Sequence, residues 1–367
     1  MKNTFGQSVS TTIFGESHGS AVGVVIDGLA PGIVVDVDFI KSQLGKRRPS
    51  GKTDTPRVEM DNFQILSGVF NGKTTGTPIA IVIPNENTKS GDYNYGVARP
   101  SHADYTAFAK YHGYEDYRGG GHFSGRVTAG LVAGGAIALS ALKNLGINIG
   151  THILACGDAC DTKFKDTKDI EEAVLSIQGK TFPVISNEAE EKIYEAITTA
   201  AAEKDSIGGY IETAITGVPA GVGEPWFDSV ESLLSHALFS IGGIKGVSFG
   251  CGDDFGKMRG SSANDTFRWE NGKAVTTTNN NGGINGGITN GMPIIINCVV
   301  KPTPSISQEQ DTVNFLKEEN AKIEIKGRHD PAIIRRICVV VDSICALTVC
   351  DLLAQRYGTD VFLRGIK

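Results

Sequence analysis

Residues 128–145 read TAGLVAGGAIALSALKNL, a run of small and aliphatic side chains with a single charge. A helix that is apolar on every side is typical of the buried centre of a fold. The run is too short and too rich in glycine and alanine to predict a membrane span. Apolar stretches at 21–27, 78–83, 210–216 and 293–300 are expected to form buried strands. These residues predict an α/β protein with buried strands and glycine-rich loops.

The bulk composition excludes several classes of protein. The 367 residues suit one large domain or two ordinary ones, and 35 basic against 41 acidic residues give a net charge of −6. Such a chain is a poor candidate for binding nucleic acid or an anionic membrane, so an anionic ligand needs a local basic pocket. The N-terminus has no signal-peptide pattern. Seven cysteines without a CxxC pair favour free thiols in a reducing cytosol, and no metal site is expected.

Two short segments recur later in the chain and in the same order. The matches pair 26–32 with 215–221, and 75–79 with 290–294. They suggest a single domain built from two related halves, at about 1–145 and 205–367. The alternative is chance similarity between Gly/Pro turns, because few residue combinations are compatible with a tight turn.

Five segments are polar for their apolar surroundings: GESHG at 15–19, KRRP at 46–49, RPSHAD at 99–104, RGGGHFSGR at 118–126 and GRHDP at 327–331. Arginine offers planar bidentate donors and histidine exchanges a proton near neutral pH, which suits a phosphorylated ligand. Each residue also has a plainer explanation. Ser101 and Asp330 are expected helix N-caps, His18 could be a core histidine, and the arginines could be solvated. The plain explanations fit less well together, since Gly or Pro frames every segment.

Two nucleotide motifs are missing or incomplete. No GxGxxG opens a helix after a strand, so a dinucleotide fold is not indicated. GVFNGKT at 68–74 imitates a phosphate-binding loop, but three residues separate its glycines where four are needed. We interpret it as a β-turn. A phosphotransferase or NTPase is therefore the weaker alternative.

The polar segments resemble the signatures of the chorismate synthase family. GESHG resembles the first signature, and RPSHADY at 99–105 resembles RPGHADY with serine in place of glycine. The other similar segments are DYRGGG at 116–121, which leads into the family's RSSARET, 240–246 (SINAVKG), 282–291 (GGISGGISNG), 301–303 (KPT) and 327–331 (GRHDP). They follow the family's order over nearly the whole chain.

The resemblance implies a fold, an activity and partners. The expected fold is an α/β sandwich with a sheet core flanked by helices, assembled as a homotetramer. The implied enzyme is a cytoplasmic lyase that converts 5-enolpyruvylshikimate 3-phosphate to chorismate and phosphate by anti-1,4-elimination, with reduced FMN, in the shikimate pathway of aromatic amino acid biosynthesis. NADPH enters only as a source of reductant, and the chain length favours an external flavin reductase.

The resemblance also assigns residues. The implied catalytic residues are His18 at the substrate phosphate, Ser17 beside it, His102 near the flavin N1–O2 edge and Asp330 near flavin N5. The arginines implied to bind substrate phosphate and carboxylates are Arg47, Arg48 and Arg126. The implied flavin-binding residues are His122, Phe123, Ser124, Gly242, Gly243, Gly286, Lys301, Pro302, Thr303, Pro304, Ser305 and Arg328.

The chain departs from the family at 122–128, where HFSGRVT stands in place of RSSARET. An arginine, a serine and a glutamate are lost, and Phe123 adds an aromatic ring suited to stacking on a flat flavin. We expect an active enzyme whose flavin affinity depends on pH through His122. The alternative is a flavin-binding protein without lyase activity.

Overall fold

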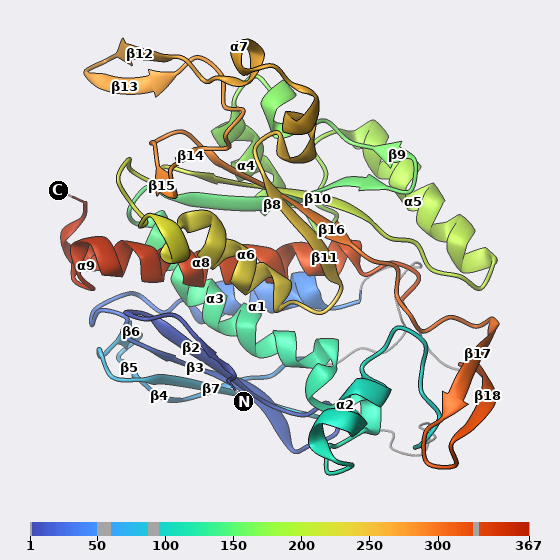
Figure 1. The fold of residues 1–367 in the computed structure, drawn as a ribbon. Helices are drawn as coiled ribbons and strands as arrows, with labels where there is room; N and C mark the ends of the chain where they lie inside the picture. The colour runs from blue at the N-terminus through green and yellow to red at the C-terminus, as the bar shows by residue number, and fades with distance from the viewer. Residues whose placement is uncertain (1, 50–59, 87–94, 326–329, 367) are drawn as a thin grey trace.

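The computed structural model describes residues 2–49, 60–86, 95–325 and 330–366. Two antiparallel five-stranded sheets enclose a layer of helices (Figure 1). The first sheet has the order β1-β2-β3-β7-β4, with β1 Thr4–Phe5, β2 Ser10–Gly15, β3 Ala21–Asp27, β4 Gln64–Ser67 and β7 Ile79–Pro84. The second has the order β11-β16-β10-β8-β9, with β8 Asn148–Cys156, β9 Ala159–Cys160, β10 Gly209–Thr216, β11 Ile244–Phe249 and β16 Ile294–Val300.

Four helices fill the space between the sheets: α1 Val37–Arg47, α3 Thr128–Lys143, α6 Val230–Phe239 and α8 Ile334–Tyr357. Alternate side chains of β3 and β7 are buried, as expected for strands covered on one face. The second sheet is also covered on its outer face, by α4 Ile170–Gln178 and α5 Asn187–Ala202. Almost every residue of β8 and β10 is therefore buried.

The α/β class is confirmed, but the layer order differs from the expectation of sheets inside and helices outside. Only the second sheet lies between helices, whereas the first forms an outer layer over α3 and α1. The reason lies in α3 and α8, which are buried along nearly their whole length. Helices that are apolar all round need cover on every side, and two sheets supply it.

The run at 128–145 forms the predicted buried helix. A Cβ on Gly130 would lie 2.6 Å from the carbonyl oxygen of Gly23 in β3, and one on Gly135 would lie 2.3 Å from Cβ of Ser343 in α8. Small residues thus let α3 approach its neighbours closely. The stretch 125–143 and α8 are long and apolar enough to cross a membrane, but their most apolar windows are 78% and 94% buried in the protein. They are core helices here.

The two sheets share a strand order. β2, β3, β7 and β4 lie side by side in the first, and β8, β10, β16 and β11 do so in the second. The repeated turns fall at matching places: Gly28 and Gly217 follow β3 and β10, with φ of 90° and 81°, and Gly76 and Gly291 precede β7 and β16, with φ of 83° and 91°. Two related halves remain a prediction that superposition would test.

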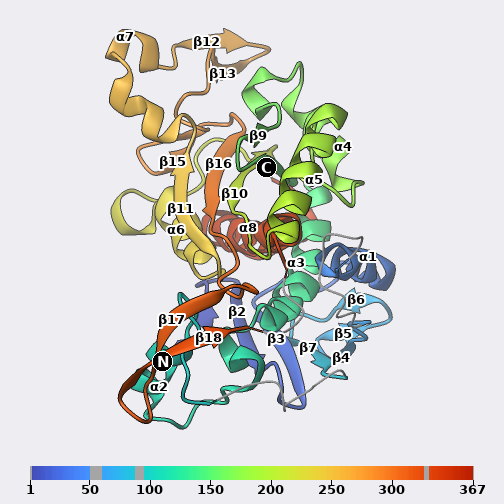
Figure 2. The same cartoon turned by 90° about the vertical axis from the view of Figure 1, so that its right-hand side faces the viewer.

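The shorter elements lie at the margins of these layers (Figure 2). The short helices are α2 Asp104–Tyr111, α7 Gly260–Ala263 and α9 Val361–Arg364. The hairpins pair β5 Val69–Phe70 with β6 Lys73–Thr74, β12 Phe267–Glu270 with β13 Lys273–Thr276, β14 Ile284–Asn285 with β15 Ile288–Thr289, and β17 Glu309–Asn314 with β18 Glu319–Glu324. The 3₁₀ turns are η2 Arg118–Phe123, η3 Gly125–Val127, η4 Phe164–Asp166, η5 Trp226–Asp228 and η6 Gly252–Lys257. The segment resembling a phosphate loop is the turn of the β5–β6 hairpin, as predicted.

Both expected helix caps are wrong. Helix α2 begins at Asp104 after Ala103, and its first turn has no side-chain cap. Helix α8 begins at Ile334 after Ile333. Asp330 pairs instead with Arg336, and Asp104, three positions after Ser101, accepts from Arg99.

Candidate active site

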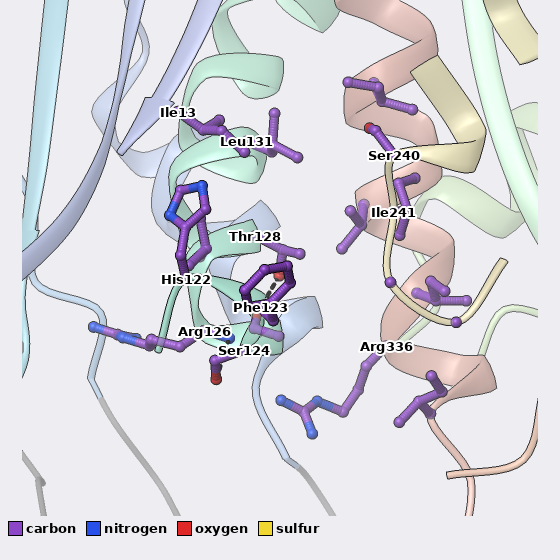
Figure 3. Close-up of a pocket in the computed structure, with 18 of the residues that line it drawn as sticks. Ile13, His122, Phe123, Ser124, Arg126, Thr128, Leu131, Ser240, Ile241 and Arg336 are labelled. Carbon is purple, nitrogen blue, oxygen red and sulfur yellow. Dashed lines mark hydrogen bonds between the residues drawn. The ribbon is translucent and has the colours of Figure 1, made fainter. Parts of the chain in front are cut away.

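A cavity of about 880 Å³ opens at one end of the helical layer. The N-terminal ends of α3 and α8 and the C-terminal end of α6 surround it (Figure 3), together with the end of α1 and strand β1. Its apolar lining comes from Phe5, Ile13, Leu131, Ile337, Val340 and Ile344, with Ile13 and Leu131 across the cavity from α8 (Figure 3). The described basic residues that line it are Lys2, Arg47, Arg48, Arg126, Lys245, Lys301 and Arg336, against one carboxylate, Asp330. An anionic ligand with a flat apolar part suits this lining.

The three arginines predicted to bind substrate meet at one buried carboxylate. Asp61 pairs with Arg47, whose Nη2 lies 2.8 Å from Oδ2, with Arg126 through Oδ1, and more distantly with Arg48, whose Nε lies 3.8 Å from Oδ2. Arg126 also donates from Nε to Asn85 Oδ1 at 2.9 Å. The Asn85 amide in turn donates to the carbonyl of Glu16, so the arginines are tied to the GESHG turn.

Charges around Asp61 set its protonation state. Burial alone would raise the pKa of this carboxyl, but the guanidinium groups of Arg47 and Arg126 outweigh burial and hold its pKa below the ordinary value. Burial lowers the pKa of Arg47, and Asp61 opposes that shift. Nε of Arg47 and Nε of Arg48 are buried without a hydrogen-bond partner among the described residues. These donors can bind a ligand anion.

His102 lines the cavity and is oriented by its neighbours. Its Nδ1 lies 2.8 Å from Oδ1 of Asp104, whose carboxylate also accepts from Arg99 Nε at 2.8 Å and Nη2 at 2.7 Å. Hydrogen bonds from Arg99 and His102 outweigh burial and hold the pKa of Asp104 well below its usual range. Nδ1 also lies 3.1 Å from Nη2 of Arg99, but its shorter contact is to the carboxylate, which only accepts, so we assign the ring proton to Nδ1.

Three consecutive glycines separate the two predicted catalytic histidines. Gly119, Gly120 and Gly121 have φ of 62°, 82° and 52°. A Cβ on Gly119 would lie 2.2 Å from Nδ1 of His18, and one on Gly120 would lie 3.1 Å from Cε1 of His102. Both rings therefore pack directly on backbone, a contact that any other residue would block.

The segment that departs from the family lies on the cavity wall (Figure 3). His122 Nδ1 lies 2.8 Å from the carbonyl oxygen of Gly15, which can only accept, so the ring donates from Nδ1. The ring of Phe123 is 45% exposed and lines the cavity. Ser124 accepts from the backbone N–H of Arg126 and caps the turn η3.

The 301–304 segment completes the opposite side. The N–H of Lys301 donates to the carbonyl of Gly243 at 2.9 Å, and its Nζ donates to the carbonyl of Ser101 at 2.7 Å. Burial and the nearby positive charge of Lys245 lower the pKa of Lys301. Oγ1 of Thr303 is buried without a hydrogen-bond partner among the described residues. Such donors suit a phosphate group.

Most of the predicted site residues line this cavity: His102, Asp330, Arg47, Arg48, Arg126, His122, Phe123, Ser124, Gly242, Gly243, Lys301, Pro302, Thr303 and Pro304. Ser17, His18, Ser305 and Gly286 do not. Ser17 and His18 are buried against Gly119. Gly286 lies in the β14–β15 turn, near the start of α6 and not its end. Arg328 lies outside the described residues.

Sequence reasoning missed several residues of the site. Asp61 stands alone in sequence, without a signal that marks it. Asp104 was visible only as the acidic residue three positions after the expected cap Ser101, a pattern that resembles a capping box. Arg336 could have been found, because two arginines in the first turn of an otherwise apolar helix are unusual. Its Nη1 pairs with Asp330. The N-terminal residues 2–5 also line the cavity. Within the described part of the chain, no three His, Cys, Asp or Glu side chains are grouped to hold a metal ion.

Comparison with known proteins agrees with this geometry. The sequence model of chorismate synthase matches residues 9–354. The chain belongs to the chorismate synthase family. It is 46% identical to the chorismate synthase of Lachnoclostridium phytofermentans, over 96% of this chain and 95% of that protein. It is 44% identical to the chorismate synthase of Methanosarcina mazei, with 95% of each covered. A crystal structure of chorismate synthase superposes with a TM-score of 0.76 at 26% identity, covering 96% of this chain and 94% of that one.

Membership identifies the chain as an enzyme, a carbon–oxygen lyase of the chorismate synthase class. It also confirms the family predicted from the polar motifs. The match extends across HFSGRVT at 122–128, so departure from the family's usual residues there leaves the chain inside the family.

Proposed function

We propose that this chorismate synthase eliminates phosphate from 5-enolpyruvylshikimate 3-phosphate, in an anti-1,4 sense, to give chorismate in the shikimate pathway. The observation that supports this most is the convergence of Arg47, Arg48 and Arg126 on one wall of a large basic cavity that also holds His102. The substrate carries a phosphate and two carboxylates. Charge-assisted contacts are worth about 1.5–3 kcal/mol each, so three of them at the upper end approach the roughly 8 kcal/mol of micromolar binding.

The residues present fit reduced FMN as the cofactor. The apolar lining can face a flat ring system, and Phe123, on the same side of the cavity as Leu131 in Figure 3, adds an aromatic ring. Backbone at Gly242 and Gly243, Lys301 and the free hydroxyl of Thr303 would hold the ring edge and the phosphate. When bound, reduced FMN supplies the electron-rich partner that a redox-neutral elimination across an unactivated ring needs.

The protein's own contribution is charge, orientation and proton placement. Buried arginines neutralise the phosphate as it departs, and they act more strongly in a cavity with apolar walls than in water. His102 can exchange a proton at Nε2 while Asp104 holds Nδ1. The carboxylate of Asp330 is held by Arg336 at the cavity wall and can accept a proton there. His18 and Ser17 would act from behind Gly119, on the phosphate side.

Anaerobic turnover with dithionite-reduced FMN tests the proposal. Release of phosphate and formation of chorismate from the enolpyruvyl ester are expected together. Flavin binding without turnover would identify a flavin-binding protein that has lost lyase activity. ATP hydrolysis without flavin would point to an NTPase instead.

The cellular setting is also proposed. We infer a cytoplasmic homotetramer that receives reduced flavin from an external reductase, with NADPH only as the ultimate source of electrons. The absence of long insertions in the 367 residues supports this dependence. Turnover with NADPH and FMN alone, without added reductase or dithionite, would contradict it. Sedimentation of the purified chain measures the oligomeric state.

A further inference from the structure

The C-terminal end of α1 is held by two arginines from the first turn of α8. Nη2 of Arg335 donates to the carbonyl of Arg48 at 2.8 Å, and its Nη1 lies 3.4 Å from the carbonyl of Lys46. Nε of Arg336 donates to the carbonyl of Arg47 at 2.7 Å. Three successive carbonyl groups at the end of one helix thus point to guanidinium groups at the start of another.

This arrangement meets a need that every helix has. The last carbonyl groups of a helix lack partners within it and carry partial negative charge, so cations bind there favourably. Arg335 is only 6% exposed, and a buried guanidinium needs acceptors for its hydrogen bonds. Nη1 of Arg335 also lies 3.5 Å from the carbonyl oxygen of Thr181, in the loop after α4, so the Arg335 guanidinium contacts that loop as well. Arg335 therefore joins three elements at one point.

The two arginines differ in their relation to the cavity. Arg336 lines it, whereas Arg335 faces the other side of α8, beside Thr181 and Cys338. Arg335 cannot reach a ligand in the cavity. The residues whose backbone it holds, however, send two side chains into the cavity, those of Arg47 and Arg48.

We propose that Arg335 is a positioning residue for anion binding: it fixes the end of α1, and so sets where Arg47 and Arg48 meet the phosphorylated substrate. This inference rests on the proposed function for the identity of that substrate. Arg48 depends on it most, because its side chain is 23% exposed and only loosely paired with Asp61, so its backbone does most to place it. Losing one charge-assisted contact of this kind lowers affinity by about 10- to 100-fold.

The experiment compares binding to the full-length chain with oxidised FMN present, so that no turnover occurs. Calorimetry with 5-enolpyruvylshikimate 3-phosphate, and separately with inorganic phosphate, is applied to wild type, Arg335→Met, Arg48→Met and the double variant. Arg335→Met should weaken binding of the ester by about 10- to 100-fold and leave FMN affinity unchanged. Arg335→Lys keeps the charge but can bond to fewer carbonyl groups, so its affinity for the ester should lie between those of wild type and Arg335→Met. Cys338→Ala, a packing change on the same face of α8, is the matched control and should bind like wild type.

The double variant decides between positioning and general support. If Arg335 acts through Arg48, replacing Arg335 in the Arg48→Met background should weaken binding much less than it does in wild type. If the affinity loss in the double variant equals the product of the losses in the two single variants, the proposal is overturned. A folded Arg335→Met protein that binds the ester like wild type would also overturn it. If Arg335→Met does not fold, Arg335→Lys and Arg335→Gln take its place, and failure of all three to fold leaves a purely structural residue.

Titrating both the ester and inorganic phosphate distinguishes failure of the Arg335 proposal from failure of the proposed function. If wild type binds phosphate but not the ester, the substrate is wrong, and the phosphate titrations still test Arg335. If it binds neither, Arg47 and Arg48 do not form an anion site, and the positioning role is refuted with it.

Discussion

Replacing Asp61 by asparagine should destabilise the protein more than any surface substitution. The change keeps the shape of the side chain and removes the negative charge that Arg47, Arg48 and Arg126 share. Arg126 keeps two other acceptors, Asn85 Oδ1 at 2.9 Å and the carbonyl of Pro84 at 3.0 Å. Arg47, whose side chain is 7% exposed, depends on Asp61 for its ion pair.

The magnitude follows from breaking a buried pair. Removing one partner from a buried ion pair costs about 3–5 kcal/mol, because the other charge stays buried without compensation. At roughly 2 °C per kcal/mol for a large domain, the melting temperature should fall by about 6–10 °C. Asp254→Asn, which breaks the exposed pair with Lys257, is the control and should change stability by less than about 1 kcal/mol.

The pH dependence gives a second measurement on the same variant. Asp61 has a folded-state pKa below its unfolded value, so its contribution is present above the unfolded pKa of about 3.9 and is lost as pH falls through the folded pKa. The stability difference between wild type and Asp61→Asn should therefore shrink in acid. Denaturant unfolding followed by circular dichroism at several pH values measures it. An Asp61→Asn protein that melts with wild type, or a difference that stays constant into strong acid, would refute the reasoning.

Three further predictions concern other parts of the protein. His18→Ala and His102→Ala should each lower turnover by about 100-fold or more with the fold intact by circular dichroism, as loss of a positioned proton donor implies; full activity in both would remove them from the mechanism. Because His122 stands where the family has an arginine, FMN affinity should rise as pH falls from about 8 to 6, and His122→Arg should flatten that dependence. A flat wild-type profile contradicts this. Asp351→Asn should cost about 3 kcal/mol or more in thermal or denaturant unfolding, since the carboxylate accepts from three backbone N–H groups in the turn before β2, and an unchanged stability would show that water replaces it.

The sequence predicted more of the residues that line the cavity than of the order of the layers. The apolar run at 128–145 shows that its helix is buried, but it carries no information about what buries it. The close approaches at Gly130 and Gly135 that bring a sheet to one side and α8 to the other depend on partners distant in sequence. The α/β class could therefore be predicted from the sequence, whereas the order of the layers could not.

At the cavity, the lining residues named from the sequence stand in compact motifs, whereas those that were missed stand alone. His102 and Arg126 were found because they stand in polar segments framed by glycine or proline. Asp61 lies among unremarkable neighbours, and only folding brings three arginines to it. Asp104 was seen, but local sequence could not tell a helix cap from a carboxylate paired with Arg99 and His102.

The N-terminal strand has a practical consequence for work with the purified enzyme. Residues 2–5 form part of the cavity wall, whereas α9 and the C-terminus lie at the opposite end of the helical layer (Figure 1). An affinity tag placed before Lys2 would begin beside the basic mouth, where a run of histidines or acidic linker residues could compete with substrate or flavin. A tag after α9 avoids this competition. Kinetic and binding constants from amino-terminal and carboxyl-terminal fusions should therefore differ, and those from the carboxyl-terminal fusion should represent the native site.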